Sequence, residues 1–272
     1  MQRIILYSVK RYLSNLIEEI IERAATSSHI LLFLDYDGTL VPICKEPSLA
    51  KLSLNDKRLL EKLSRIPWFS TGIISGRSLE DIRSLVGVKG LFYAGNHGFE
   101  IAFQGIVWVH PALNSFKVEL QEITRKLKYH TRGINGILVE DKRETVSVHY
   151  RKVTGMTPGE IIKIISMVLE PYAKMFTVTR GKKVYEVRPN IDWDKGKAVV
   201  KISQLLDLQT KPLKIYIGDD QTDEDAFKML GEDDISIRVG YKKGSKAQYF
   251  CKRSSEVLQF LKKLVMLNNS KK

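Results

Sequence analysis

The chain has 272 residues, a hydrophobic fraction of 43%, a charged fraction of 28% and a formal net charge of +13. This is the composition of an ordinary globular protein of about two domains. No apolar run approaches the roughly 20 residues that span a bilayer, and residues 4–9 lack the features of a signal peptide. The lysines and arginines are scattered and do not alternate with aromatic residues, so the charge favours an anionic small substrate over nucleic acid and no membrane partner is expected.

The cysteine content is low. Cys44 and Cys251 are too few for a disulfide framework, and they lack the spacing of metal ligands. We therefore expect reduced thiols and a cytoplasmic location.

Helical and strand patterns alternate at both ends of the chain, which predicts a parallel, doubly wound sheet. The hydrophobic periodicity predicts these segments in chain order: helix 10–25, strand 30–34, helix 54–65, strand 69–74, helix 78–85, strand 91–93, helix 195–206, strand 214–217, helix 222–230, strand 235–239 and helix 255–264.

The pattern differs in the middle of the chain. Helical stretches at residues 112–129 and 158–170 are each followed by a pair of strands, at 136–150 and 175–187. Helix, hairpin, helix, hairpin is a self-contained α+β layer.

We therefore predict an α/β protein with a Rossmann-like core and an inserted cap. The core comprises residues 1–104 and 186–272, with residues 1–28 as an N-terminal helical extension. The inserted α+β cap domain comprises residues 105–185.

Polar side chains follow three of the predicted core strands at their carboxyl ends. Asp35 and Asp37 follow the first, Ser75 the second, and Asp219 and Asp220 a later one. Ligands of open parallel sheets bind outside these ends. Any one of these residues could be a helix cap or a turn, but three strands that share the feature predict a common cleft.

Carboxylates gathered from separate strands repel one another unless a cation neutralises them. A cluster with only oxygen ligands selects a hard divalent ion, and Mg²⁺ is the usual partner of phosphate chemistry. The spacing of His97 and His149 is unsuited to zinc. The sequence therefore predicts a magnesium site.

The same segments supply the other groups that hydrolysis of a phosphate ester requires. An aspartate can attack phosphorus, and a second acid can protonate the leaving alkoxide, so Asp35 and Asp37 form a suitable pair. Ser75 and the Gly76 amide can bind phosphate oxygens, and Lys195 offers a positive charge to the phosphoryl group.

Four segments resemble the motifs of the haloacid dehalogenase superfamily of phosphatases, in the expected order. They are LDYDGTL (34–40), IISGR (73–77), DKGKA around Lys195, and GDDQTDEDAF (218–227). Longer strings resemble trehalose-6-phosphate phosphatases more closely: DYDGTLVPI (35–43), GNHGFE (95–100), VEDKRETVSVHYR (139–151) and EVRPNIDWDKGKA (186–198).

The resemblance implies a Mg²⁺-dependent phosphatase that converts trehalose 6-phosphate to trehalose through an aspartyl-phosphate, the last step of trehalose biosynthesis. Asp35 would be the nucleophile, Asp37 the general acid and base, and Ser75, Gly76 and Lys195 the phosphate-binding groups. Mg²⁺ would be held by Asp35, the Asp37 backbone carbonyl and Asp219, with Asp220 and Asp223 in support. The candidate sugar contacts are Arg77, His97, Glu140, His149, Arg151, Glu186 and Arg188.

Several alternatives remain at this stage. The substrate could be another sugar phosphate, such as sucrose phosphate or mannosyl-phosphoglycerate. The chain could also be a regulatory module that binds a sugar phosphate without turnover, although its intact motifs argue against this. A separate trehalose-phosphate synthase is an expected partner. Nucleic-acid binding would reveal itself as strongly salt-dependent retention.

Overall fold

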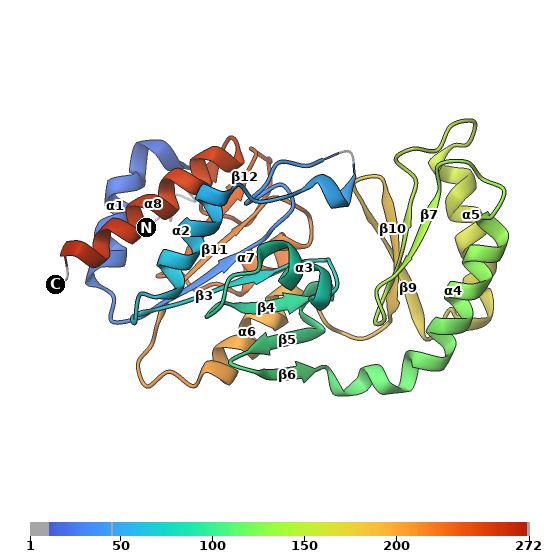
Figure 1. The fold of residues 1–272 in the computed structure, drawn as a ribbon, viewed down its shortest axis with the longest axis horizontal. Coiled ribbons are helices and arrows are strands. Elements are labelled where there is room, and N and C mark those ends of the chain that lie inside the picture. The colour runs from blue at the N-terminus through green and yellow to red at the C-terminus, as the bar shows by residue number, and fades with distance from the viewer. Residues whose placement is uncertain (1–10, 45, 271–272) are drawn as a thin grey trace, which may run out of the picture.

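The computed structural model describes residues 11–44 and 46–270, so residues 4–9, for which no signal peptide is predicted, lie outside the described part. Two sheets organise the molecule, a nine-stranded one in the larger body and a four-stranded one in the smaller body (Figure 1). Within the described residues, no helix has both the length and the apolarity needed to cross a bilayer.

The nine-stranded sheet forms the core. From one edge to the other, its strands are β1 (Arg11–Tyr12), β13 (Tyr249–Cys251), β12 (Ile235–Val239), β11 (Leu213–Gly218), β2 (Ile30–Leu34), β3 (Phe69–Ile74), β4 (Phe92–Gly95), β5 (Glu100–Phe103) and β6 (Ile106–Val109). The pairs from β1 through β4 are parallel, whereas β5 and β6 continue the sheet in antiparallel fashion. The predicted parallel α/β core is therefore confirmed, with an antiparallel hairpin added at one edge.

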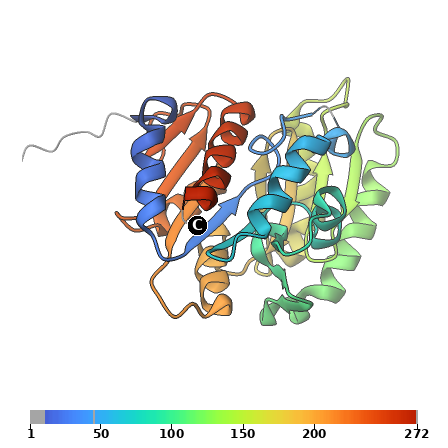
Figure 2. The same cartoon turned by 60° about the vertical axis from the view of Figure 1, so that its left-hand side comes forward.

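Both faces of this sheet are covered, because successive side chains of a strand point to opposite faces. Ile30, Leu32 and Leu34 pack on one side, whereas Leu31 and Phe33 pack on the other. The helices on the first side are α1 (Leu13–Thr26), α2 (Leu54–Ser64), α3 (Leu79–Val86) and α8 (Ser254–Ser270). Those on the second side are α6 (Lys195–Leu206) and α7 (Asp223–Met229). Figure 2 shows α1 beside α8, so the described helix of the predicted N-terminal extension packs against the core.

The smaller body has its own sheet and its own hydrophobic core. Its strands, in spatial order, are β7 (Leu138–Asp141), β8 (Val146–His149), β10 (Val184–Pro189) and β9 (Phe176–Gly181), all antiparallel. The helices α4 (Lys117–Thr131) and α5 (Pro158–Leu169) pack against it. Short 3₁₀ turns occur at η1 (Pro47–Leu49), η2 (Asn96–Gly98), η3 (Pro111–Phe116) and η4 (Glu170–Tyr172).

The limits of this cap differ from the predicted 105–185 at both ends. Strand β6 pairs with β5 in the core sheet, so the cap begins after β6. Strand β10 runs through the predicted end of the cap to Pro189. An alternating or apolar run predicts a strand but does not indicate which sheet it joins, because that depends on the pairing partner.

Two helix caps fix the loops that carry candidate functional residues. Ser78 begins α3 by accepting a hydrogen bond from the Asp81 amide at 3.2 Å. Asp194 begins α6 by accepting one from the Lys197 amide at 2.9 Å. Capping of this kind sets where the chain enters the helix, so Lys195 stands at the first position of α6.

Candidate active site

Asp35, Ser75 and Asp219 follow the ends of three neighbouring strands, β2, β3 and β11. In the register of the sheet, Leu34 of β2 lies between Ile73 of β3 and Ile217 of β11. The next residue in each chain segment therefore reaches the same edge, and the Asp35 amide donates to the Ile217 carbonyl at 2.9 Å. This register brings the residues that follow β2, β3 and β11 to one side of the molecule.

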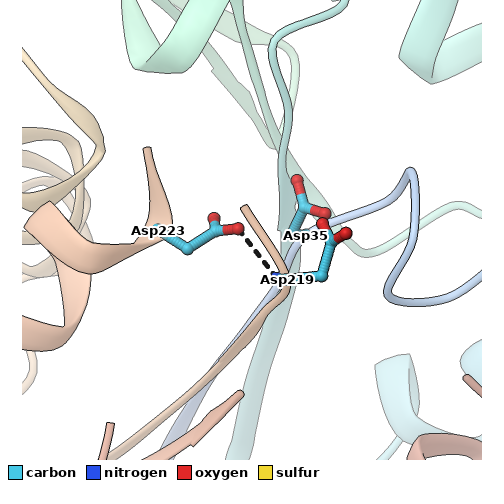
Figure 3. Close-up of side chains that lie close together, drawn as sticks. All are labelled: Asp35, Asp219 and Asp223. Carbon is cyan, nitrogen blue, oxygen red and sulfur yellow. Dashed lines mark hydrogen bonds between the residues drawn. The ribbon is translucent and has the colours of Figure 1, made fainter. Parts of the chain in front are cut away.

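Three carboxylates meet at this edge (Figure 3). One side-chain oxygen from each of Asp35, Asp219 and Asp223 lies within 4.8 Å of the others, and all three residues are buried. Asp37 is outside this carboxylate group, so its side chain points elsewhere. Its backbone carbonyl remains the predicted metal contact of that residue.

Lys195 joins the nucleophile candidate to its neighbour. Its ammonium donates to Asp35 Oδ1 at 2.8 Å and to Asp223 Oδ1 at 2.6 Å, with only 2% of the residue exposed. Burial alone would lower the pKa of Lys195, but the two carboxylates raise it well above its usual value. The side chain therefore carries a fixed positive charge.

Asp223 organises the loop rather than offering an open ligand. Its Oδ2 accepts hydrogen bonds from the Asp219 and Asp220 amides, at 2.9 and 2.8 Å. The Tyr216 hydroxyl donates to Oδ1 at 2.8 Å. Burial opposes its ionisation, but Lys195 and these donors hold the pKa of Asp223 below its ordinary value. Asp220, in turn, accepts from the Gln221 amide at 2.7 Å.

Burial raises the pKa of Asp35 well above its ordinary range, and Lys195 offsets only part of this rise. Burial also raises the pKa of Asp219, although Lys182 opposes it by donating to Asp219 Oδ2 at 2.6 Å. Gly38 lies directly against this carboxylate, since a Cβ at that position would come within 2.2 Å of the same oxygen. The lysines thus offset the negative charge of Asp35 and Asp219 only in part.

Arg77 holds Asp37, although the sequence placed it among the sugar contacts. Its Nε and Nη2 donate to the two oxygens of Asp37 at 2.6 and 2.8 Å, and Nη1 donates to Asp81 at 2.7 Å. The ring of Tyr36 lies against the guanidinium, 5.5 Å from centroid to Cζ. Arg77, a residue of the core, therefore fixes the position of the Asp37 carboxylate.

The loop after β3 carries Ser75 and Gly76, the two predicted phosphate-binding residues. Ser75 is 1% exposed, and its hydroxyl accepts from the Arg77 amide at 3.2 Å. Gly76 lies against His97, and a Cβ at this position would come within 2.7 Å of the ring. Only glycine allows the imidazole to approach this closely.

A second polar cluster lies where the cap meets the core. Glu186 of β10 accepts from His97 at 2.9 Å, from Lys142 at 3.2 Å and from Thr145 at 3.1 Å. Lys142 also donates to the Gly76 carbonyl at 2.8 Å. Burial would raise the pKa of Glu186, but Lys142 and His97 hold it well below its ordinary range. The cluster thus presents a carboxylate and donors next to the loop of Ser75 and Gly76.

The remaining sugar candidates are dispersed. His149 and Glu140 form a pair at 2.7 Å on adjacent strands of the cap. Arg151 donates to the Lys182 carbonyl at 3.0 Å, in the turn between β9 and β10. Arg188 donates to the Trp193 carbonyl at 2.5 Å, and its guanidinium packs over the ring of Phe99. Both contacts are to residues of the core.

Sequence reasoning missed two lysines at this site. Lys142 and Lys182 both come from turns of the cap and reach groups of the core. A lysine in a polar turn is usually solvated, so only the docking of the cap distinguishes them. Lys142 does lie within the string that resembles the trehalose-6-phosphate phosphatases, which was the available signal.

Comparison with known proteins places the chain in a family. The model of the family described as trehalose-phosphatase matches residues 33–256. Probable trehalose-phosphate phosphatase E of Arabidopsis thaliana is 38% identical over 272 residues, covering 94% of this chain and 75% of the relative.

Solved structures agree with this placement. The C-terminal domain of C. albicans trehalose-6-phosphate phosphatase superposes with a TM-score of 0.79 at 25% identity, covering 95% of this chain and 99% of that one. A haloacid dehalogenase-like hydrolase from Bacteroides thetaiotaomicron, at 16% identity and a TM-score of 0.62, shares the fold over 87% of this chain and 99% of its own. The chain therefore belongs to the trehalose-phosphatase family and is a phosphatase with a haloacid dehalogenase-like fold.

Proposed function

We propose that this chain hydrolyses trehalose 6-phosphate to trehalose and inorganic phosphate, with Asp35 as the nucleophile and Mg²⁺ as the cofactor. The observation that carries the proposal is the convergence of Asp35 and Asp219 at adjacent strand ends, with Lys195 of α6 bonded to Asp35, in a chain that belongs to the trehalose-phosphatase family. A synthase that makes trehalose 6-phosphate is the expected source of the substrate.

The residues present fit a magnesium ion. The donor set consists of oxygen atoms, burial leaves two carboxylates short of positive charge, and a glycine at position 38 lets the backbone lie close to Asp219. The ion would be held by the Asp35 and Asp219 side chains and the Asp37 carbonyl, with Asp220 and Asp223 in support. When bound, it supplies positive charge that polarises the phosphoryl group.

The first half of the reaction uses Asp35 and Asp37 in different roles. A carboxylate oxygen of Asp35 attacks phosphorus, and the bond from phosphorus to the sugar oxygen breaks. A protonated Asp37 gives its proton to that oxygen, so trehalose leaves as the neutral alcohol. Lys195, fixed beside Asp35, offsets the negative charge that gathers on the phosphoryl oxygens.

The second half regenerates the enzyme. Asp37, now ionised, takes a proton from water while the water oxygen attacks phosphorus of the aspartyl-phosphate. The acyl phosphate bond breaks, inorganic phosphate leaves and Asp35 returns as a carboxylate. Ser75 and the Gly76 amide hold the phosphoryl oxygens through both halves, and the bond from the Arg77 amide to the Ser75 hydroxyl supports this role by orienting the hydroxyl.

The cap supplies the expected selection for a disaccharide. Glu186 and Lys142 lie beside the phosphate-binding loop, where an ionised acceptor and a cationic donor can both bind sugar hydroxyls. The nucleophile is 5% exposed and cap residues contact the core around it, so the cap must move to admit a substrate.

Phosphate release from a panel of substrates tests the proposal. The panel contains trehalose 6-phosphate, sucrose phosphate, mannosyl-phosphoglycerate and glucose 6-phosphate, each with Mg²⁺ and with excess chelator. We expect the highest kcat/KM for trehalose 6-phosphate and no turnover in chelator. A higher value for another sugar phosphate would reassign the substrate, and binding without any release would support a regulatory module.

A further inference from the structure

Lys182 of the cap enters the acidic centre of the core. It lies in the turn between β9 and β10, and its ammonium donates to Asp219 Oδ2 at 2.6 Å. Half of the Lys182 side chain is exposed, whereas the Asp219 side chain is 7% exposed. The ammonium therefore reaches a buried carboxylate from the solvent side of the cleft.

The position of Lys182 depends on the position of the cap. Arg151 donates to the Lys182 carbonyl at 3.0 Å, and the Tyr150 amide donates to the Lys183 carbonyl at 3.1 Å. These bonds tie the turn to the strand and loop of the cap around β8. The contact with Asp219 is consequently a contact between the two bodies of the protein.

Asp219 cannot serve two cations equally well. It is a proposed ligand of Mg²⁺, and the lysine ammonium now occupies one of its two oxygens. Two positive charges at one carboxylate repel each other strongly in a poorly solvated site. A phosphoryl group carries two negative charges and would offset that repulsion from within the cleft.

We propose that Lys182 and Mg²⁺ compete for Asp219 when the cap contacts the core as in this structure. A bound phosphoryl group then lets both cations stay in the site, with Mg²⁺ at Asp219. The inference rests on the proposed function, because it requires magnesium at Asp219. Lys182 then turns from Asp219 to the phosphoryl oxygens and holds the cap closed over them. It acts as a positioning residue that makes closure depend on an anion in the cleft.

The test compares the affinity for Mg²⁺ of the wild type, Lys182→Met and Lys183→Met by isothermal titration calorimetry. Lys183 is the matched control because it is the exposed neighbour in the same turn. Without phosphate, we expect Lys182→Met to bind Mg²⁺ about 10-fold more tightly than the wild type. Saturating inorganic phosphate should tighten Mg²⁺ binding by the wild type more than by Lys182→Met. Lys183→Met should match the wild type in both titrations.

Two other results have different meanings. If all three proteins bind Mg²⁺ with equal affinity in the absence of phosphate, the competition is overturned while the magnesium site stands. If none of them binds Mg²⁺, the metal assignment fails and this inference falls with it. Because the readout is metal affinity, a loss of fold or of activity in the variant cannot imitate tighter binding.

Discussion

Arg77 donates two hydrogen bonds to Asp37, at 2.6 and 2.8 Å, and so fixes both oxygens of the proposed general acid and base. The same guanidinium is held by Asp81 of α3, four residues along the chain. One arginine thus sets the direction of the Asp37 carboxyl group, and at least one of these two bonds must loosen before Asp37 can give a proton to the leaving sugar.

Replacing Arg77 by lysine should lower kcat by about 10- to 100-fold, because general acid–base catalysis depends on the direction of the carboxyl group. A lysine keeps the charge but cannot form the paired bonds. Steady-state kinetics with trehalose 6-phosphate measures the change, with Arg83→Lys on the exposed face of α3 as the control. An unchanged kcat in Arg77→Lys would remove Arg77 from the positioning of Asp37.

Asp35→Asn should lower kcat by about 10⁴-fold or more without weakening the fold. Folding raises the pKa of Asp35, so this carboxyl ionises more readily in the unfolded chain and its charge destabilises the metal-free fold at neutral pH. Removing the charge should leave the urea midpoint at pH 7 equal to that of the wild type or higher. A much lower midpoint would show that the Asp35 carboxylate stabilises the structure.

Glu186→Gln should cost about 3 kcal/mol of unfolding free energy at pH 7, because it removes the carboxylate from a buried, paired site. Folding lowers the pKa of Glu186, so the ionised carboxylate stabilises the folded protein. This contribution to the free energy of unfolding is fully present above the ordinary glutamate pKa of about 4.3 and is lost as the pH falls from there toward the lower pKa of the folded state.

Urea unfolding of the wild type and Glu186→Gln at pH 7 and in acid measures this difference. The difference in unfolding free energy between the wild type and Glu186→Gln should become smaller in acid. The control Glu22→Gln, on the exposed face of α1, should match the wild type at every pH. A gap that stays constant with pH would show that ionisation of Glu186 is irrelevant to its role.

Chelation of divalent ions should abolish phosphate release, and Mg²⁺ should restore it. Ca²⁺ should restore much less, because it prefers more ligands at longer distances than this small oxygen site is built to give. Activity assays after dialysis against chelator provide the measurement. Full turnover in excess chelator would refute the metal assignment.

The strand ends that form the centre were predictable from the sequence. Strands 69–74 and 235–239 and helix 195–206 have the predicted bounds, because each is a strongly patterned run with clear flanking signals. Once the sheet is parallel, the residues that follow its strands must share an edge, and Asp35 after β2 and Asp219 after β11 do lie together.

Several contacts that shape the site and the cap were not predictable. Arg77 was assigned to the sugar, but it binds Asp37, which is 40 residues away in the sequence. Lys182 and Lys142 reach the core only because the cap docks as it does, and a turn lysine gives no local sign of a buried partner. Residues 106–109 fell within the predicted cap and were not predicted as a strand, because their apolar pattern does not encode the pairing of β6 with β5.

Trapping of the phosphorylated enzyme tests the central claim most directly. Enzyme quenched during turnover of trehalose 6-phosphate is reduced with borohydride, which converts an aspartyl-phosphate to homoserine, and the peptides are then sequenced by mass spectrometry. The Asp37→Asn variant should accumulate more of the product, since activation of water for the second half depends on Asp37. We expect homoserine at position 35 in both proteins. Homoserine at another aspartate, or a complete absence of homoserine while phosphate is released, would contradict Asp35 as the nucleophile.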